Sequence, residues 1–474
     1  MKLTLFSCAM LLVSMPLLAA PEMDAPLIAA QAKHYTMVPE QLSRYQASAF
    51  PDRIILIPTT QPAHSQTVNW RTNAGLLKPE AEIALAQSGP GFVWQSSRVV
   101  ATSQSIQTEN GLALQHSVTF RDLKPDTQYV YRVKGAGTWS EWLQFRTATA
   151  GFAPFSFIYF GDAQNHNKSQ VSRVMREALL TRPRAKLMLH AGDLVSSREG
   201  NHDNEWGEWF DALGWAGAML NQFITPGNHE YVEDEQEQHH LVPQFAAQFN
   251  GLRNGPAPLQ DTVYYTDYQG VRFISLNSMA ALQDEAMATL QAQWLKQVLG
   301  NNPARWTVVT YHHPMFSVSQ GRDNPILRQH WQPVLDQYPV DLVLQGHDHT
   351  YGRVSQQASN GQLSGAVYIV SVAGPKMYLS SDTSRQHMQR LAEDTQLFQL
   401  IDITENELKY QALTVTGELY DGFVIQKQGK QRILKEAANL PATRLCGTPE
   451  QLRVRASRCW NSTEFNLPAL PFNL

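Results

Sequence analysis

The sequence has few cysteines and no excess of positive charge. Three cysteines occur among 474 residues and none forms a Cys-x-x-Cys pair, which excludes a dense disulfide framework and that redox motif. Lysine and arginine number 38 against 42 aspartates and glutamates, so the chain has no basic field to hold nucleic acid or an anionic membrane. Glycine (28) and proline (26) are close to average usage, which excludes collagen-like and low-complexity classes.

Two common catalytic motifs are also missing. The chain contains neither a Gly-x-x-x-x-Gly-Lys-Ser/Thr phosphate loop nor a Gly-x-Ser-x-Gly nucleophile elbow. What is present is an ordinary globular composition, 43% hydrophobic and 17% charged. A chain of this length and composition predicts two or three packed units with a sizeable core.

Residues 1–20 are typical of a secretory signal peptide. Lys2 precedes an apolar stretch over residues 3–18, which is too short for a comfortable membrane span, and Ala19 and Ala20 end it in small residues. An uncleaved N-terminal anchor is the alternative. We therefore expect export to the periplasm or outside the cell, and no membrane span in the mature chain.

The mature chain would keep two of the three cysteines, because Cys8 leaves with the signal segment. Cys446 and Cys459 lie thirteen positions apart in a loop-like tail, and an oxidising compartment would join them. Such a disulfide contributes about 3 kcal/mol in the chain-entropy description. Two free buried thiols are the alternative.

Residues 50–148 contain short runs of β-forming residues separated by Gly, Pro and Asn. The runs predict strands at residues 53–57, 67–70, 117–120 and 129–133, and their spacing fits a small all-β sandwich. The segment Leu123 to Val133, with Trp70 upstream and Trp-Ser-Glu-Trp at 139–142, resembles a fibronectin type III domain. Trp70 is expected in its core, and residues 148–153 are expected to be a linker.

Residues 153–415 show apolar strands that alternate with helical stretches, which is typical of α/β layers. Strands are predicted at residues 155–160, 186–189, 222–225, 271–276, 306–310, 341–344 and 367–372, and helices at 170–180 and 284–299. Ligands of such folds bind in loops at the carboxyl ends of strands. Residues 416–474 are predicted to form a hairpin followed by a polar tail that holds the cysteine pair.

Five polar clusters follow predicted strands in this second unit. They are Gly161-Asp162, Gly192-Asp193, Gly227-Asn228-His229-Glu230, His312-His313-Pro314 and Gly346-His347-Asp348-His349. A single Gly-Asp pair is most often a turn. Packing does not require all five together, however, and carboxylate, amide and imidazole groups are metal ligands. The set therefore predicts a metal centre.

The ordered set resembles the calcineurin-like metallophosphoesterase superfamily, and within it the purple acid phosphatase branch. The match includes residues 346–353, Gly-His-Asp-His-Thr-Tyr-Gly-Arg, which are close to the Gly-His-x-His-x-Tyr-x-Arg of that branch. The fibronectin-like unit that precedes these motifs is also consistent with that branch. The resemblance implies a four-layer α/β domain, a β-sandwich flanked by helices, that holds two metal ions.

The resemblance also implies a role for each matching residue. Asp193 would bridge the two ions, Asp162 and His349 would hold the first, and Asn228, His312 and His347 would hold the second. His313 competes with His312, which the family pattern His-x-Pro favours. His229 would lie near the leaving group, where it can donate a proton, or else hold Asp162 in place.

The sequence departs from the branch at several positions. Ser196 stands where the purple enzymes have a tyrosine ligand that gives their colour, so we expect a colourless protein. Gln164 stands where other superfamily members have histidine, and it or water would complete the first metal shell. The paired phosphate-binding histidines of plant members are not recognisable in residues 316–324, and Arg322 or His166 could take that role.

The function predicted from these residues is an exported, dinuclear metal-dependent phosphoesterase that acts on phosphomonoesters through activated water. The metals would be two divalent or mixed-valence ions of Fe, Mn or Zn, and the partner a small phosphate ester rather than nucleic acid. One alternative is a phosphodiesterase or nucleotide pyrophosphatase on the same site. Another is a non-catalytic binding or adhesion protein that uses the fibronectin-like unit. The sequence does not fix the oligomeric state.

Overall fold

The computed structural model describes residues 36–38, 42–76, 78–196, 203–429 and 431–446. The predicted signal segment at residues 1–20 and Cys459 lie outside them, so export and the Cys446–Cys459 pairing stay predictions. Within the described ranges, no helix has the length and apolar character needed to cross a membrane.

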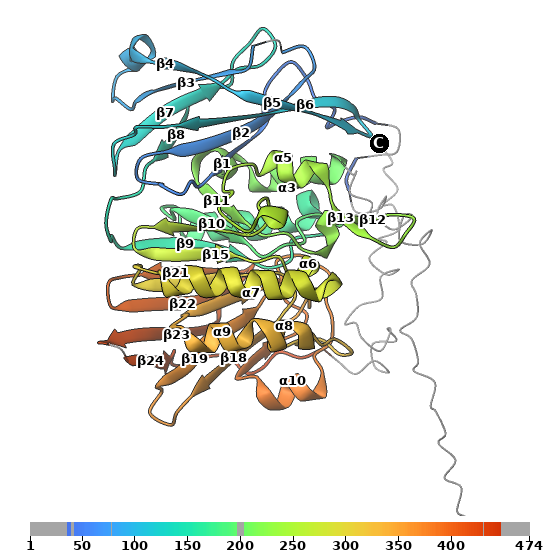
Figure 1. Ribbon diagram of the computed structural model, residues 1–474, viewed down its shortest axis with the longest axis vertical. Coiled ribbons are helices and arrows are strands. Elements are labelled where there is room, and N and C mark those ends of the chain that lie inside the picture. The colour runs from blue at the N-terminus through green and yellow to red at the C-terminus, as the bar shows by residue number, and fades with distance from the viewer. Residues whose placement is uncertain (1–35, 39–41, 77, 197–202, 430, 447–474) are drawn as a thin grey trace, which may run out of the picture.

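The N-terminal part is a sandwich of two β-sheets, which caps one end of the long axis of the molecule (Figure 1). Its strands are β1 (Asp52–Ile57), β2 (Gln66–Asn73), β3 (Glu80–Leu85), β4 (Ser97–Val100), β5 (Thr102–Thr108), β6 (Gly111–Phe120), β7 (Gln128–Val133) and β8 (Leu143–Arg146), with a 3-10 helix η1 (Pro90–Gln95). One sheet has the order β4-β3-β7-β8 and the other runs β1-β2-β6-β5. All four strands predicted here are confirmed.

Aromatic side chains fill the sandwich. Trp70 and Tyr131 are fully buried, and the indole Nε1 of Trp70 donates to the Lys134 carbonyl at 3.0 Å. Tyr129 lies in the same apolar cluster, and its hydroxyl accepts a hydrogen bond from the Lys124 backbone at 2.8 Å. Buried aromatic rings supply much of the apolar contact, while their polar atoms find backbone partners. The predicted core position of Trp70 is confirmed.

The sandwich shares a sheet with the rest of the chain. Strand β1 pairs in parallel with β11, where Leu56 lies opposite Asn221, so one sheet of eleven strands runs through both parts. Tyr131 also donates to the carbonyl of Ala218 at 2.6 Å. The sequence predicted a linker at residues 148–153 and did not predict this joint, because pairing between distant strands leaves no local pattern.

The second part consists of two large sheets packed face to face and a separate two-stranded sheet of β12 and β13. Its strands are β9 (Phe155–Phe160), β10 (Leu187–His190), β11 (Asn221–Ile224), β12 (Tyr231–Glu233), β13 (His239–Leu241), β14 (Tyr264–Tyr268), β15 (Val271–Ser275), β16 (Trp306–Thr310), β17 (Leu342–Gln345), β18 (Tyr351–Gln357), β19 (Leu363–Val370), β20 (Arg390–Ala392), β21 (Leu397–Ile403), β22 (Glu407–Thr414), β23 (Leu419–Gln428) and β24 (Gln431–Glu436). The large sheet has the order β24-β23-β22-β21-β9-β10-β11-β1-β2-β6-β5, and the facing sheet β14-β15-β16-β17-β19-β18-β20. The strands predicted for this part are confirmed.

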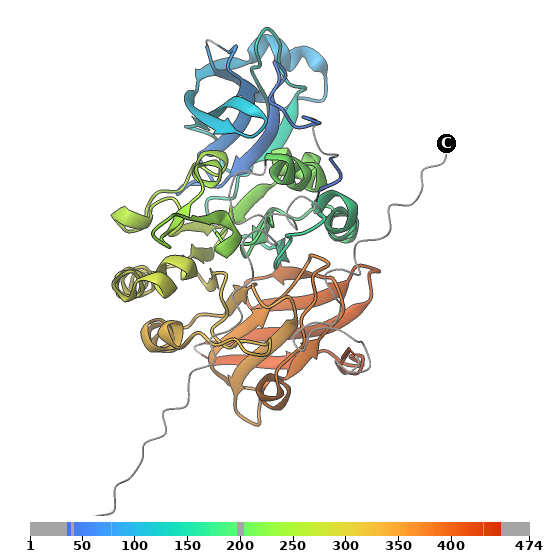
Figure 2. The same cartoon turned by 90° about the vertical axis from the view of Figure 1, so that its right-hand side faces the viewer.

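Helices cover both outer faces (Figure 2). They are α2 (Ser172–Thr181), α3 (Asp203–Leu213), α4 (Trp215–Met219), α5 (Pro243–Gln248), α6 (Ser278–Gln283), α7 (Glu285–Gly300), α8 (Pro325–His330), α9 (Gln332–Gln337) and α10 (Asp382–His387), with a π-helix η2 (Asn167–Val171) and 3-10 helices η3 (Asn228–Glu230) and η4 (Ala257–Leu259). Both predicted helices, at 170–180 and 284–299, are confirmed to within two residues as α2 and α7.

Three apolar clusters define the layers. One lies between the sheets and joins Phe157 to Phe273. A second packs the large sheet against α2, α3 and α5, and a third packs the facing sheet against α7, α8 and α9. Strands buried on both faces read as continuous apolar runs, which is why the sequence indicated them clearly. The predicted four-layer domain, a β-sandwich flanked by helices, is confirmed.

Candidate metal centre

The polar clusters gather where parallel strands end. Strands β9, β10 and β11 are parallel neighbours in the large sheet, and β15, β16 and β17 are parallel neighbours in the facing sheet. Each cluster follows the last residue of β9, β10, β11, β16 or β17. Because carboxyl ends of parallel strands meet at one edge, side chains far apart in the sequence converge there.

The first donor group contains Asp193, His312 and His347, whose ligand atoms lie within 4.8 Å of one another. The Nε2 atom of His312 is 3.1 Å from Asp193 Oδ2, and His347 Nδ1 is 3.1 Å from His312 Nε2. Asn228 joins them, because its Oδ1 lies 2.9 Å from His347 Nδ1 and 3.2 Å from His312 Nε2. These four side chains therefore converge on a small volume.

The second donor group contains Asp162, Asp193 and His349, again within 4.8 Å. His349 Nε2 lies 3.2 Å from Asp162 Oδ2. Asp193 belongs to both groups, so the two groups share one carboxylate. The structure thus brings together all six residues that the sequence proposed as ligands.

Backbone contacts orient the imidazole rings. His312 Nδ1 lies 2.8 Å from the Ala191 carbonyl, and His349 Nδ1 lies 3.0 Å from the Lys376 carbonyl. A carbonyl only accepts, so each Nδ1 carries a hydrogen and each Nε2 is the ring atom directed toward the carboxylates. A hydrogen bond from the ring nitrogen that does not face the metal fixes the tautomer of metal-binding histidines.

The site uses unusual backbone conformations. Asp193, His347 and His349 have φ values of 50°, 74° and 49°, in the left-handed region that residues other than glycine rarely adopt. Gly227 and Gly346 allow the close approach, since a Cβ at either would lie 2.1 Å from an oxygen of Asp193 or Asp162, respectively. Strained backbone of this kind persists where the surroundings over-determine it, and it clusters at functional sites.

Burial and neighbouring charges shift the pKa values in the group. Burial, reinforced by the Asp193 charge and partly offset by His312, raises the pKa of Asp162 to about 7. Burial opposes protonation of His312, yet Asp193 and Asp162 raise its pKa to about 9. Burial, followed by the charges of Arg322 and Lys376, respectively, holds the pKa values of His347 and His349 well below their usual range. Those two imidazoles are neutral at physiological pH, as metal ligands must be.

Two buried oxygens near the donor groups have no hydrogen-bond partner among the described residues. Asp162 Oδ2 and Gln164 Oε1 are buried and accept no hydrogen bond within that part of the chain. Leaving such oxygens unsatisfied costs free energy, and a cation would satisfy them. Oxygen and imidazole donors together suit first-row transition metals. The residues present therefore fit a pair of such cations.

His313 lies beside the group rather than in it. Its Nδ1 is 2.9 Å from the Ser278 hydroxyl, and its ring centre is 4.1 Å from that of His347. Neither donor group includes it.

His229 faces the shared carboxylate. Its backbone N–H donates to Asp193 Oδ1 at 2.9 Å, its Nδ1 contacts the Ser196 carbonyl, and its Nε2 lies 3.9 Å from Asp193 Oδ2. The contact to Ser196 assigns the hydrogen to Nδ1, so Nε2 is the atom that can gain or lose a proton toward the group.

The two positions that depart from the resembled branch have defined contacts. The Nε2 atom of Gln164 lies 3.0 Å from Asp193 Oδ2 and 2.7 Å from His349 Nε2, so this amide lies within the second donor group. Ser196 is buried, and its hydroxyl accepts a hydrogen bond from Asn165 at 2.8 Å.

The candidate phosphate-binding residues differ in their surroundings. Arg322 donates to the His347 carbonyl and lies 3.3 Å from Asp348, and its side chain keeps 28% of its surface exposed. His166 directly precedes the π-helix η2 and has a left-handed φ of 53°. Arg322 is thus attached to the backbone of a site residue.

Glu230 is a contributor to which the sequence assigned no role. It is fully buried, and its carboxylate accepts hydrogen bonds from the backbone N–H groups of Gly227, Asp193 and Leu194 at 2.6, 2.9 and 2.8 Å. It therefore ties the loop after β11 to the loop after β10. Its place in the Gly-Asn-His-Glu cluster was the available signal, but the acceptor role depends on a loop distant in sequence.

The layered fold and the donor groups at the strand ends are those of a calcineurin-like phosphoesterase domain. Residues 155–351 match the family described as calcineurin-like phosphoesterase. Residues 51–147 match the N-terminal domain of purple acid phosphatase. The two parts of the chain thus match, in order, the N-terminal domain of purple acid phosphatase and the calcineurin-like phosphoesterase domain.

Curated relatives agree with these matches. The chain is 27% identical over 325 residues to an uncharacterized protein of Mycobacterium tuberculosis, covering 60% of this chain and 59% of that protein. It is 27% identical over 256 residues to Fe(3+)-Zn(2+) purple acid phosphatase 12 of Arabidopsis thaliana, covering 52% of this chain and 53% of the relative. It is 25% identical over 329 residues to human acid phosphatase type 7, covering 65% of this chain and 71% of that protein. The chain thus spans a little over half the length of the first two relatives.

One solved structure shares most of the fold. The structure of PhoD matches with a TM-score of 0.58 and 14% sequence identity, and the match covers 85% of this chain and 94% of that one. At this identity, the similarity concerns the fold alone.

Proposed function

We propose that the chain hydrolyses phosphate monoesters by attack of water at a centre that holds two cations of Fe, Mn or Zn. Asp193 would contact both cations, with Asp162 and His349 on one and Asn228, His312 and His347 on the other. The side-chain oxygen Oε1 of Gln164, buried with no hydrogen-bond partner among the described residues, is a further candidate ligand on the Asp162 side. Cations of this type polarise phosphoryl oxygens and lower the pKa of water, which is the chemistry they would supply.

The chain's own residues would orient and protonate the substrate. His229 presents Nε2 toward the shared carboxylate while Nδ1 is held by the Ser196 carbonyl. A proton on Nε2 would be given to the leaving alkoxide, and an imidazole titrates in the range this step needs. Arg322 is held by His347 and Asp348, and its remaining N–H groups are available to phosphate oxygens.

One observation carries the proposal: the two donor groups share Asp193. A shared carboxylate keeps two cations close enough to act on one phosphoryl group, at about 3.5–4 Å in two-metal sites generally. The neutral amide of Asn228 limits the negative charge around the centre, so that an anionic ester is still attracted.

The test combines metal analysis with a substrate panel on the same preparation of the full chain. We expect about two cations per chain, as in two-metal sites, and faster turnover of 4-nitrophenyl phosphate than of bis(4-nitrophenyl) phosphate. Asp193→Ala should lower kcat/KM by at least about 1000-fold, equivalent to about 4 kcal/mol, and should release metal. The control is Asp261→Ala, at a partly exposed aspartate paired with Arg253, which should keep both the wild-type kcat/KM and the bound metal.

Other outcomes would favour the alternatives. Preference for the diester would favour a phosphodiesterase or nucleotide pyrophosphatase on the same site. A metal content near zero, or unchanged activity in Asp193→Ala, would favour a binding or adhesion protein. The same preparation tests the expected absence of colour, because Ser196 offers no phenolate for a charge-transfer band.

Export and the tail disulfide belong to the same proposal. Both depend on residues 1–20 or Cys459, outside the described part of the chain, while Cys446 packs beside Val372, Met377 and Leu379. N-terminal sequencing of protein from the periplasm or medium should begin near residue 20. Mass spectrometry without reductant should recover a Cys446–Cys459 crosslink.

A further inference from the structure

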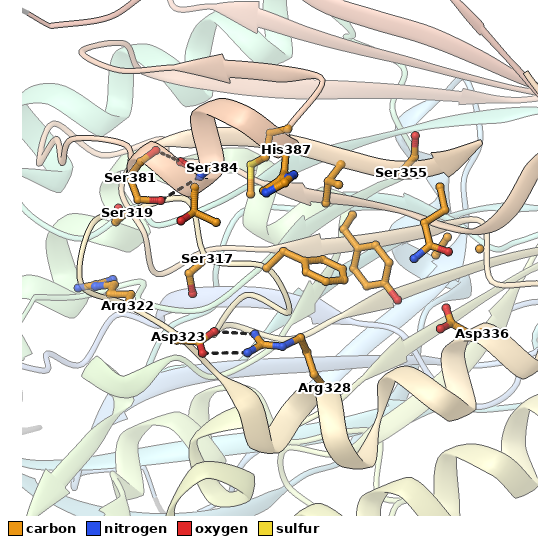
Figure 3. Close-up of a pocket in the computed structure, with 18 of the residues that line it drawn as sticks. Ser317, Ser319, Arg322, Asp323, Arg328, Asp336, Ser355, Ser381, Ser384 and His387 are labelled. Carbon is orange, nitrogen blue, oxygen red and sulfur yellow. Dashed lines mark hydrogen bonds and ion pairs between the residues drawn. The ribbon is translucent and has the colours of Figure 1, made fainter. Parts of the chain in front are cut away.

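Residues 316–324 form a loop in the connection between β16 and α8, and this loop borders a cavity of about 650 Å³ (Figure 3). Strands β18 and β19 and helix α10 line the cavity from other sides, and none of the six proposed metal ligands lines it. Arg322 is one of the loop residues in the lining. A side chain beside a cavity has few packing contacts on that side, so its polar contacts decide where it lies.

Asp348 makes the polar contacts that fasten this loop to the metal centre. It lies between two proposed ligands in the Gly-His-Asp-His motif, and its side chain is fully buried. Its Oδ2 atom accepts hydrogen bonds from the backbone N–H groups of Val318 and Ser319 at 2.5 and 3.2 Å. Its Oδ1 atom lies 3.3 Å from Nη1 of Arg322. Both oxygens of Asp348 therefore contact the loop, and neither donor group includes them.

Arg322 is held through one nitrogen of its guanidinium group. Nη1 donates to the His347 carbonyl and faces Asp348, while the guanidinium carbon lies 4.9 Å from the centre of the Tyr378 ring. Neither polar contact involves Nε or Nη2. These two nitrogens lie on one edge of the planar group, and such an edge binds two oxygens of one phosphate side by side. The contacts of Arg322 therefore leave a phosphate-binding edge open.

The charge of Arg322 reaches the first donor group. Its Nη1 contacts the backbone of His347, which belongs to that group. Burial, followed by the charge of Arg322, holds the pKa of His347 well below its usual range. An anion bound to cations at this group would be attracted by the same guanidinium charge.

The neighbouring aspartate of the loop makes a different contact. Asp323 pairs with Arg328 at 2.7 Å, and its side chain keeps 63% of its surface exposed. Figure 3 shows Asp323 joined to Arg328, while Arg322 points away from both. Among the described residues, the carboxylate that pairs with Arg322 is the buried one of Asp348.

We propose that Asp348 is a positioning residue for phosphate binding. It holds Nη1 of Arg322, so that the edge formed by Nε and Nη2 faces a phosphate group at the metal centre. The inference rests on the proposed function, in which Arg322 binds the phosphate of the substrate. An arginine side chain has many rotamers, and fixing it before the substrate arrives removes that entropic cost from binding.

The primary test is a calorimetric titration of the metal-loaded full chain with inorganic phosphate. Asp348→Asn is isosteric: its amide oxygen can still accept from Val318 and Ser319, but its NH₂ group would face the donors of Arg322. We expect the Kd for phosphate to rise at least about tenfold with the cation content unchanged, and Arg322→Met to give a similar loss. The matched control is Asp323→Asn, in the same loop, which should keep the wild-type Kd.

A double variant separates positioning from a general structural role. If Asp348 acts through Arg322, Asp348→Asn should weaken phosphate binding no further in a chain that already carries Arg322→Met. Losses that multiply in the double variant overturn the proposal. An unchanged Kd in Asp348→Asn, or a loss of cations from that variant, overturns it as well.

A crystal structure of the metal-loaded wild-type chain with phosphate needs no variant, and it decides if Asp348→Asn does not fold. Nε and Nη2 of Arg322 should both lie within about 3.2 Å of phosphate oxygens, with Nη1 still facing Asp348. A phosphate out of reach of Arg322, or an Arg322 separated from Asp348, overturns the proposal.

Kinetics distinguish a failure of this inference from a failure of the proposed function. With 4-nitrophenyl phosphate, Asp348→Asn should raise KM about tenfold and change kcat less than about threefold, because Arg322 would hold the phosphate in both the ground state and the transition state. An unchanged KM overturns the role of Asp348. If the wild-type chain does not hydrolyse this ester, the proposed function fails, and the phosphate titrations still test Asp348 because binding does not require hydrolysis.

Discussion

Two polar clusters whose members are mostly buried are built in opposite ways. The arginine–aspartate cluster consists of Arg53, Arg71, Asp203 and Asp52. Arg71 contacts Asp203 at 2.8 Å and Asp52 at 2.6 Å, and Arg53 contacts Asp203 at 2.6 Å. Two guanidinium groups thus face two carboxylates, and the cluster is neutral within the chain.

The donor cluster, made of Asp162, Asp193, Asn228, His312, His347 and His349, is not complete in itself. It has two carboxylates, neutral His347 and His349, and the buried oxygen of Asp162 without a partner among the described residues. The difference shows how to tell a structural cluster from a functional one. The first satisfies its own charges, while the second presents lone pairs that need a cation.

The largest effect on stability is expected from breaking the arginine–aspartate cluster. Asp203→Ala would leave Arg53 buried without its carboxylate and Arg71 with Asp52 alone. Removing one partner of a buried ion pair costs about 3–5 kcal/mol. Urea unfolding should report that loss, and metal analysis should find the cation content unchanged. A stability equal to wild type would mean that the cluster is not structural.

The largest effect on rate without loss of metal is expected at His229. His229→Ala should lower kcat by about 10²–10⁴-fold, because it removes the proposed proton donor but no proposed ligand. His240→Ala, at an exposed histidine paired with Asp234, is the matched control. Loss of metal in His229→Ala would assign the residue to the donor cluster instead.

Adding cations should stabilise the chain through the donor cluster alone. Metal-stripped protein should gain about 2.7 kcal/mol when Zn²⁺ or Mn²⁺ reaches 100 times its Kd. The gain, read as a rise in melting temperature, should persist in Asp203→Ala and disappear in Asp193→Ala. A gain in both variants would place the cation elsewhere.

Glu230 should tune the donor cluster without belonging to it. Glu230→Gln keeps the shape but weakens the hydrogen bonds to the N–H groups of Asp193, Leu194 and Gly227. Changes of this indirect kind cost about 10- to 100-fold in metal affinity. Metal titration should detect that loss, with kcat restored at saturating metal. Glu233→Gln, at an exposed glutamate, should change nothing.

The smallest effect is a pH dependence that the donor cluster should cause and the arginine–aspartate cluster should not. In metal-free protein, burial lowers the pKa of the His312 imidazole, but the charges of Asp193 and Asp162 outweigh burial and raise that pKa to about 9. Its stabilisation is complete below its ordinary pKa near 6.5 and is lost as pH rises through about 9. Burial alone would raise the pKa of Asp203, but the charges of Arg53 and Arg71 outweigh burial and lower that pKa. Asp203 therefore stays ionised in this pH range, and the arginine–aspartate cluster adds no pH dependence to the free energy of unfolding.

Urea unfolding of metal-free protein at pH 6.5–9 should therefore show a falling free energy of unfolding. His312→Gln should flatten the curve, whereas Asp203→Ala should keep its slope. An unchanged slope in His312→Gln would assign the titration to another group.

Much of the fold was readable from local patterns. Apolar runs such as residues 155–160 and 306–310 predicted buried strands, and the periodicity of residues 284–299 predicted α7. Strands β18 and β21–β24 were not predicted individually, although most of β21 and β22 is also buried. Their apolar pattern is less continuous than the runs of β9 and β16, and the pairing of β21 with β9 joins residues that are distant in sequence.

The candidate site was likewise predictable from the sequence only in part. The five polar clusters at strand ends, together with their resemblance to the metallophosphoesterase pattern, indicated the six side chains. The role of Glu230 could not be assigned and that of Gln164 was left open between Gln164 and water as ligand, because each depends on contacts with Asp193 and its loop. The clear separation of His312 from His313 also required the structure, since adjacent residues of the same type look alike in a sequence.

The sequence by itself determined the two-part architecture and the chemical identity of the donors, because hydrophobic periodicity and residue type are local properties. The tertiary structure alone decided that β1 and β11 fuse the two parts into one sheet, that Glu230 joins the loops after β10 and β11, and that Arg322 lines a cavity. Those features are distances between residues remote in the chain, and only packing determines such distances.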